Sequence, residues 1–190
     1  MLNRKIFFDG IRHGPFDGKL SKGQVEGISS LLDEFERRPD LSLEELAYIL
    51  ATAKWETAHT MQPIAEIGKG KGRKYGVKDK TGQVAYGRGY VQLTWTRNYE
   101  KADENIGLDG ELVKDYDLAL RPDIAAQILF QGMADGWFTG KKLANYFDGE
   151  TGKADFFNAR KIVNGLDRAR EIANIAKMFY ADLQLSREAT

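Results

Sequence analysis

Glu56 stands in a segment of the sequence that favours acid chemistry. Apolar residues recur on one face of a helix predicted over residues 43–57, and Tyr48, Trp55 and His59 form an aromatic stripe on another face. A helix that is apolar almost all round is normally buried, and burial raises the pKa of a carboxyl group because it disfavours the charged form. A carboxyl group that stays protonated at neutral pH can act as a general acid.

Glu56 also has a purely structural interpretation. Carboxylates are rarely buried without a partner, and a salt bridge at the helix end could supply one, with Arg73, Lys74 or Arg88 as the cation. The spacing of the residues leaves both interpretations open.

Cleavage of a glycosidic bond would need a second carboxylate, and Glu66 is the first candidate. Glu66 lies ten residues after Glu56, at the start of a glycine-rich stretch, and Asp79 is the reserve candidate. Inverting enzymes hold the two carboxyl groups about 6.5–9.5 Å apart and retaining enzymes about 5–5.5 Å apart. The sequence does not give this distance, and a glutamate in a loop is often simply solvated.

Helices are predicted on both sides of these candidates. The first helix covers residues 21–38, with Ser21 and Gln24 forming a capping box at its start. A second begins after residue 40 or 42 and continues to about residue 60. Helical patterns resume after residue 96 and include a helix from Pro122 to Trp137. Another helix is predicted from Lys153 to Val163, with Asn164-Gly165 as its C-cap. A last helix contains Ile172 to Leu183, and the end at Ser186–Thr190 is expected to be frayed.

The segment from residue 67 to residue 91 has a different character. It contains seven glycines, and each glycine inside a helix costs roughly 1 kcal/mol. Asp79 to Gly82 has the composition of a turn between two short strands. The sequence therefore predicts one mainly α (α+β) domain over residues 1–190, with its core at about 21–185 and a small β-lobe set into it.

Composition excludes several classes of function. The chain has 190 residues, of which 42% are hydrophobic and 29% charged, and its 28 basic residues balance its 28 acidic ones. A neutral chain does not favour a general nucleic-acid binder. With no cysteine and two histidines, neither a metal site nor an organic cofactor is expected. No segment has the composition of a signal peptide or a membrane span, so we expect a soluble protein without stable membrane insertion.

Three segments, in order, resemble the family 19 glycoside hydrolases, which comprise plant-type chitinases and a branch of phage endolysins. The run Gly-Arg-Gly-Tyr-Val-Gln-Leu-Thr-Trp-Thr-Arg-Asn-Tyr at 87–99 is similar to the family signature. Trp55-Glu56-Thr57 resembles its His-Glu-Thr segment, and Ile162-Val163-Asn164-Gly165 its Ile-Asn-Gly segment. The resemblance covers about residues 43–183.

The resemblance implies roles for individual residues. Glu56 would be the proton donor and Glu66 the second acidic residue. The polar residues that hold the sugar or orient the water would be Gln92, Thr94, Asn98 and Asn164. It also implies a lysozyme-like fold, with the catalytic cleft between the helix that carries Glu56 and a small β-hairpin lobe.

Departures from the family pattern favour the endolysin branch. Trp55 replaces the usual histidine, Tyr90 the usual proline, and Arg97 a position that is commonly tyrosine in plant enzymes, whose cysteines are also absent. The expected function is cleavage of the β-1,4 glycan strands of bacterial peptidoglycan by a monomer with no separate wall-binding domain. Such an enzyme would wait in the host bacterial cytoplasm and reach the periplasmic wall with the help of a holin.

Other functions stay open. A chitinase or a non-catalytic cell-wall-binding module would share these features, and the sequence does not separate hydrolysis from lytic transglycosylation or identify the bond that is cut. Trp95 and Tyr99 are interpreted as core residues rather than sugar platforms, and Arg88 as a partner of backbone carbonyls or a carboxylate. The basic run from Lys69 to Lys74 could attract an anionic cell wall or form a solvated loop.

Overall fold

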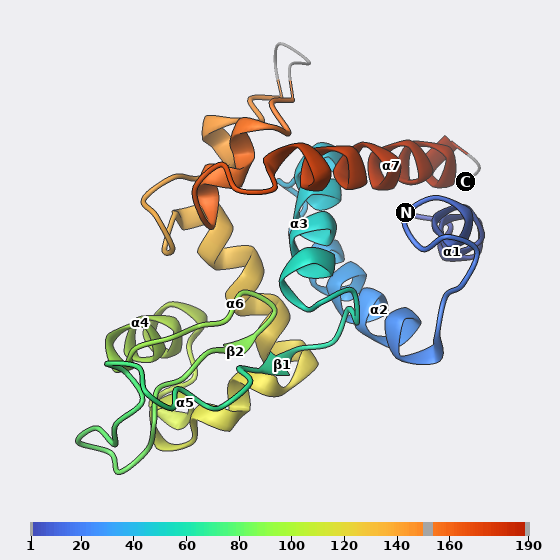
Figure 1. The fold of residues 1–190 in the computed structure, drawn as a ribbon. Coiled ribbons are helices and arrows are strands. Elements are labelled where there is room, and N and C mark those ends of the chain that lie inside the picture. Colours follow the sequence, from blue (N-terminus) through green and yellow to red (C-terminus); the bar gives the residue numbers. More distant parts are fainter. Residues whose placement is uncertain (1, 150–153, 189–190) are drawn as a thin grey trace.

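The computed structural model describes residues 2–149 and 154–188, and helices dominate it (Figure 1). The α-helices are α1 (Arg4–His13), α2 (Lys22–Glu36), α3 (Leu43–Glu56), α4 (Thr96–Ile106), α5 (Glu111–Lys114), α6 (Pro122–Asp135) and α7 (Ala169–Glu188). The 3₁₀ helices are η1 (Tyr116–Leu120), η2 (Leu143–Asn145) and η3 (Asn158–Ile162), and the strands are β1 (Ile64–Ala65) and β2 (Arg88–Gly89). No helix in the described part of the chain is long and apolar enough to cross a membrane.

Helix α3 is the central element of the core. Ser42 and Glu45 form a capping box at its start, and the residues from Leu46 to Lys54 are all buried. Helices α2, α6 and α7 pack around it. The predicted burial of this helix is confirmed. It ends at Glu56 rather than near residue 60, because the residues that follow adopt left-handed backbone conformations.

Helix α1 and the C-terminal end of α7 extend the core beyond its predicted limits. Phe7 and Ile11 of α1 are fully buried, and α1 packs against α7. The backbone N–H of Asn3 donates to the carbonyl of Ser186 (3.0 Å), and Ser186 is itself buried. The prediction of a frayed end is therefore wrong at Ser186, which is buried at the start of α1, while Ala189 and Thr190 lie outside the described residues.

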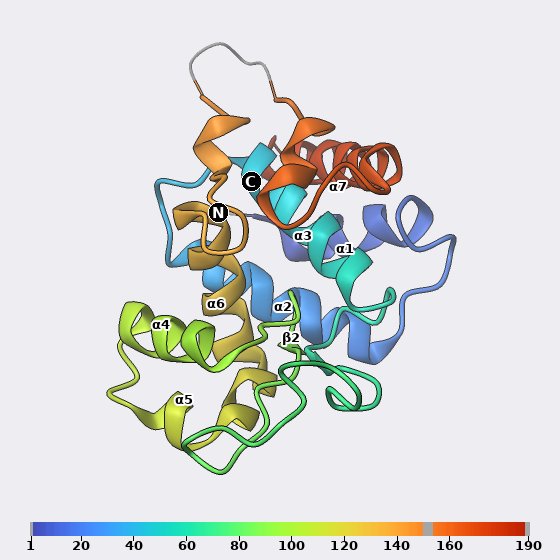
Figure 2. The same cartoon turned by 60° about the vertical axis from the view of Figure 1, so that its left-hand side comes forward.

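The β-lobe follows α3 in the chain. Strands β1 and β2 pair antiparallel, with Ile64 opposite Gly89 and Ala65 opposite Arg88. A single bridge between Lys78 and Val84 closes the predicted turn at 79–82. In Figure 1, these strands lie in the same half of the molecule as α4 and α5, away from α7. Strand β2 packs against η1, and Figure 2 shows β2 from another side.

The helix predicted from Lys153 to Val163 is wrong. Lys153 lies outside the described residues, Ala154 forms a bridge with Phe147, and only the 3₁₀ helix η3 follows. Phe156, Ala159 and Ile162 are buried at a spacing of three, which matches the three-residue turn of a 3₁₀ helix. Packing of this stripe thus selects the tighter helix.

Candidate active site

Glu56 forms an ion pair with Arg160 at the end of α3. The Nη1 atom of Arg160 lies 2.6 Å from Oε1 of Glu56, and the two side chains are 4% and 20% exposed, respectively. The Nε atom of Arg160 donates to the carbonyl of Asp167 (3.1 Å), which fixes the guanidinium. Burial without a charged partner, the first interpretation of Glu56, is therefore wrong. The alternative interpretation, a salt bridge at the helix end, is confirmed, but its cation is Arg160 and not Arg73, Lys74 or Arg88.

The pairing leaves one oxygen of Glu56 available. Arg160 donates to Oε1, and Oε2 accepts no hydrogen bond from any described residue. A carboxyl group held by one oxygen can still carry a proton on the other. The geometry therefore accommodates an acid, with Arg160 setting its direction and stabilising the carboxylate that remains after proton transfer.

Asn164 is joined to this pair through the backbone. Its N–H donates to the carbonyl of Arg160 (3.0 Å), while its side-chain oxygen accepts from the N–H of Gly165 (2.8 Å). Asn164 is exposed. The role of Asn164 in binding sugar stays a prediction. Arg160, four residues earlier, was not among the predicted residues, because a lone arginine gives no pattern that indicates its distant partner.

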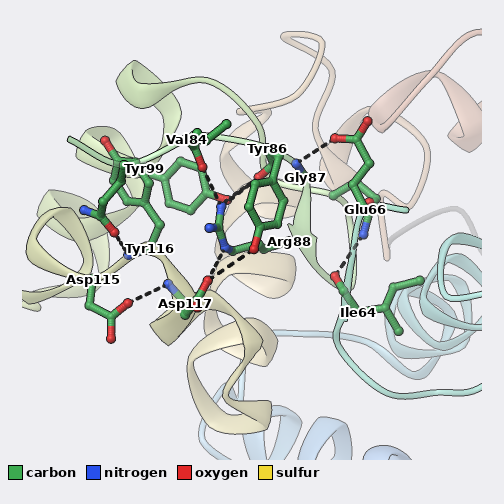
Figure 3. A network of polar contacts seen from close by, with 12 residues as sticks. Ile64, Glu66, Val84, Tyr86, Gly87, Arg88, Tyr99, Asp115, Tyr116 and Asp117 are labelled. Carbon is green, nitrogen blue, oxygen red and sulfur yellow. Dashed lines mark hydrogen bonds and ion pairs between the residues drawn. The ribbon is translucent and has the colours of Figure 1, made fainter. Parts of the chain in front are cut away.

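Glu66 is held by two neutral donors. The hydroxyl of Tyr75 donates to Oε1 (2.9 Å), and the backbone N–H of Gly87 donates to Oε2 (3.1 Å). Figure 3 shows the contact with Gly87, whose carbonyl in turn accepts from the N–H of Glu66 (2.7 Å). Both oxygens of Glu66 are therefore oriented by the lobe. Neither of the two donors is a cation, so these contacts do not neutralise the carboxylate.

Gln92, Thr94 and Asn98 form a hydrogen-bonded chain beside Glu66. Gln92 Nε2 donates to the carbonyl of Ile64 (3.1 Å), Thr94 Oγ1 to the carbonyl of Gln92 (2.7 Å) and Asn98 Nδ2 to the carbonyl of Thr94 (2.6 Å). The side-chain oxygens of Gln92 and Asn98 accept no bond from the described residues. They are suitable acceptors for the hydroxyl and amide N–H groups of an N-acetylated sugar.

Arg88 stabilises the lobe from inside (Figure 3). Its side chain is 5% exposed, and its Nε lies 2.7 Å from Oδ1 of Asp117. Its Nη1 lies within 3.1 Å of the carbonyls of Val84 and Tyr86, and its guanidinium stacks 3.5 Å from the ring centre of Tyr86. The interpretation of Arg88 as a partner of carbonyls and a carboxylate agrees with these contacts. They fix the backbone next to Gly87, which orients Glu66.

Asp79 fastens the turn of the lobe to its neighbours. Oδ1 accepts from the backbone N–H and hydroxyl of Thr81 (2.8 and 2.6 Å), and Oδ2 accepts from the hydroxyls of Tyr116 (2.6 Å) and Thr96. Desolvation raises the pKa of Asp79, but these hydrogen bonds outweigh it and hold the pKa well below its usual range. A carboxylate so stabilised is a weak base, so Glu66 is the better candidate for the second carboxylate.

We expect Asp79→Asn to destabilise the fold by about 1–3 kcal/mol at pH 7, because the amide has one acceptor oxygen in place of the two that together accept four hydrogen bonds. Because the pKa of Asp79 is lowered in the folded state, its contribution to stability decreases as the pH falls. The contribution of Asp79 is fully present above its unfolded pKa of about 4 and is lost as the pH falls toward its folded value. Urea unfolding of wild type and variant at pH 7 and pH 3 measures this, and a stability difference that is no smaller at pH 3 would contradict it.

The segment after Glu56 is strained and clamped against α2. Ala58, His59 and Met61 have φ of 48°, 69° and 58°, conformations that non-glycine residues adopt only at a cost. Gln24 Nε2 donates to the carbonyl of His59 (2.9 Å). A Cβ on Gly27 would lie 1.7 Å from the carbonyl oxygen of Met61. Strain of this kind is typical of functional sites, and here it fixes the path of the chain from Glu56 to the lobe.

Gly27→Ala is expected to lower the free energy of unfolding by about 1–3 kcal/mol, because the methyl group overlaps a backbone oxygen. The matched control is Gly23→Ala in the same helix, where an added Cβ meets nothing within 4 Å. Alanine favours the helix by up to about 1 kcal/mol, so the control should be as stable as wild type or more so. Equal thermal stability of the two variants would contradict the close packing of Gly27 against the backbone of Met61.

Two hollows in the surface lie at the opposite end of α3. Their volumes are about 330 and 530 Å³, and both are lined by Ser42 and Leu43. Since α3 is 14 residues long, it separates them from Glu56 by about 20 Å.

In the described part of the chain, no group of three or more acidic, histidine or cysteine side chains is placed to hold a metal ion. The candidate site is therefore defined by its two carboxylates, Glu56 and Glu66, and by the hydrogen-bonded side chains of Gln92, Thr94 and Asn98.

Comparison with solved structures assigns the fold. The chain aligns over 96% of its length with 76% of chitinase C from Streptomyces griseus HUT6037, with a TM-score of 0.64 and 21% sequence identity. The predicted mainly helical, lysozyme-like fold with a small β-hairpin lobe is confirmed.

Comparison of sequences gives a chitinase relative as well. The chain is 38% identical over 119 residues to Chitinase 5 from rice (Oryza sativa subsp. japonica), a match that covers 56% of this chain. The match spans 41% of the length of that relative. No family model matches the chain. Both relatives are chitinases, in agreement with the resemblance that the motifs indicated.

Proposed function

We propose that this chain is a family 19-type glycoside hydrolase that cleaves β-1,4 bonds between N-acetylated amino sugars. The observation that carries the proposal is the pair of differently held carboxylates: Glu56 on a guanidinium with one oxygen available, and Glu66 on two neutral donors beside a chain of polar side chains. The chitinase relatives support the same reaction class.

Glu56 is the proton donor in this proposal. A bound sugar covers Glu56 and removes water from it, which favours the neutral form of the carboxyl group. Oε2 then transfers the proton to the glycosidic oxygen as the bond to the anomeric carbon breaks. The electron pair of that bond remains on the leaving oxygen, and Arg160 stabilises the carboxylate that forms.

Glu66 is the second catalytic carboxylate. It either accepts a proton from the attacking water or stabilises the positive charge that develops on the sugar ring. Tyr75 and Gly87 keep its oxygens in one orientation, which is a requirement for a group that positions water. Gln92 and Asn98 would hold the N-acetyl or hydroxyl groups of the sugar.

Bacterial peptidoglycan is the substrate we favour, with the chain acting as an endolysin. The departures from plant chitinases at Trp55, Tyr90 and Arg97 support this choice, and so do the basic residues of the lobe. Chitin is the second candidate, since both relatives are named as chitinases.

A reducing-end assay on purified peptidoglycan and on chitin oligomers tests the function and the substrate together. We expect new reducing ends from peptidoglycan and slower release from chitin. Faster cleavage of chitin would make the chain a chitinase. Binding to both polymers with no fragments released, even at high protein concentration, would overturn the proposal in favour of a non-catalytic binding module.

A further inference from the structure

Trp95 is exposed on the lobe, contrary to the prediction that it is a core residue. Trp95 is 42% exposed, whereas Tyr99 is fully buried, which confirms the core prediction for Tyr99. Trp95 also has a φ of 74°, a conformation that a large side chain rarely adopts. Its N–H donates to the carbonyl of Ala85 (2.9 Å), which maintains this conformation. An aromatic ring held outward at a cost in backbone strain points to a binding role.

The ring of Trp95 forms one wall of a pocket that adjoins Glu66. The pocket has a volume of about 210 Å³ and is lined by Lys74, Tyr75, Val77, Asp79, Ala85, Trp95 and Thr96. Tyr75 meets Trp95 edge to face at 5.3 Å between ring centres. The hydroxyl of the same Tyr75 donates to Glu66. The pocket is thus separated from the second carboxylate by a single side chain.

The chain segment that supplies Lys74, Tyr75, Val77 and Asp79 to the pocket is strongly basic. Residues 67–80 contain the six cations Lys69, Lys71, Arg73, Lys74, Lys78 and Lys80 and the one anion Asp79, a net charge of +5 in a chain whose net charge is zero. Of the six, Lys80 pairs with Glu100 (2.7 Å), and no other ion pair to a described residue involves them. The charge of Asp79 is already stabilised by Thr81, Thr96 and Tyr116. The unpaired positive charge is therefore complementary to an anionic ligand.

We propose that this pocket is a subsite for an acidic amino-sugar strand, in which Trp95 stacks against a sugar ring and Lys74 pairs with a carboxylate carried by the strand. Peptidoglycan carries carboxylates on the peptides that are attached to its sugars, whereas chitin is neutral. The inference rests on the proposed function and specifies its substrate class. Stacking on an aromatic face is indifferent to charge, so Trp95 supplies affinity and Lys74 supplies the preference for the acidic strand.

The test measures binding separately from cleavage. All variants are made in a Glu56→Gln background, and calorimetry follows binding of a peptide-bearing peptidoglycan tetrasaccharide and of a chitin tetrasaccharide. We expect Trp95→Ala to weaken both by about ten-fold or more. Lys74→Glu should weaken only the acidic ligand, by about three- to ten-fold at low salt, and the difference should disappear at high salt.

Matched controls lie on α7, at the other end of the molecule. Met178→Ala removes an apolar side chain from a residue of similar exposure (38%), and Lys177→Glu reverses an exposed lysine. Both should bind as the parent does. The subsite is wrong if Trp95→Ala and Lys74→Glu bind both ligands like these controls. If the protein with Glu56 intact still cleaves peptidoglycan in that case, the proposed function stands without the subsite, whereas binding without any cleavage would refute the function alone.

Discussion

Glu56→Gln is expected to lower the rate of glycan cleavage by about 10³-fold or more, without loss of the fold. General acid catalysis contributes typically about 10²–10⁴-fold, and an amide cannot supply the proton. The glutamine oxygen can still accept the hydrogen bond from Arg160, so the end of α3 should keep its structure. The loss of turbidity of bacteria stripped of their outer membrane measures the rate.

The control for this substitution lies on the same helix. Glu44 accepts a hydrogen bond from the hydroxyl of Tyr180 (2.5 Å) at the opposite end of α3, so Glu44→Gln also replaces a hydrogen-bonded carboxylate. It should lyse cells at nearly the wild-type rate. Lysis by Glu56→Gln at that same rate would remove Glu56 from the mechanism.

Glu66→Gln is expected to lower the rate of hydrolysis by about 10²–10⁴-fold, while KM changes little. The amide cannot deprotonate water or stabilise a developing cation as a carboxylate does. The glutamine oxygen can still accept from the N–H of Gly87, and its amide N–H can donate to the hydroxyl oxygen of Tyr75, so the side chain should keep its place and the sugar should still bind. Initial rates on soluble oligomers separate kcat from KM.

Glu104→Gln on the exposed face of α4 is the matched control for Glu66→Gln, and it should leave both constants unchanged. Wild-type kcat in Glu66→Gln would exclude Glu66 as the second carboxylate. It would also favour a transglycosylation route, in which water is not the nucleophile.

Local sequence signals predicted those parts of the molecule that depend on neighbouring residues. Ser21 and Gln24 form the predicted capping box, and the helix that carries Glu56 is buried as its apolar faces indicated. Gln92, Thr94 and Asn98, found through one contiguous motif, occupy one hydrogen-bonded chain. Each of these features is encoded within a few residues, by capping geometry or by helical and turn spacing.

Features that depend on distant partners could not be predicted in the same way. Arg160 lies 104 positions from Glu56, and no residue type or spacing near Glu56 indicates it. Helix α1 is stable because α7 covers it, and the segment of η3 adopts a 3₁₀ helix because its buried residues repeat every three positions. Tryptophan is a large apolar residue of the kind that fills cores, and only the backbone conformation of Trp95 turns its side chain outward.

The ion pair of Glu56 with Arg160 changes the physical basis of the acid. The sequence indicated a carboxyl group kept neutral by apolar neighbours, whereas the structure places a guanidinium on one of its oxygens. In the proposed mechanism the proton is transferred from Oε2, the oxygen that Arg160 does not contact. In this account Arg160 is a positioning residue, which directs the carboxyl group and stabilises its ionised form after transfer.

Mass spectrometry of the fragments that wild type and Glu56→Gln release from purified peptidoglycan tests the central claim most directly. Wild type should yield muropeptides with hydrolysed, reducing sugar ends, and Glu56→Gln should yield none above the level of a protein-free sample. Release of the same fragments by both proteins, or of none by either, would contradict the account.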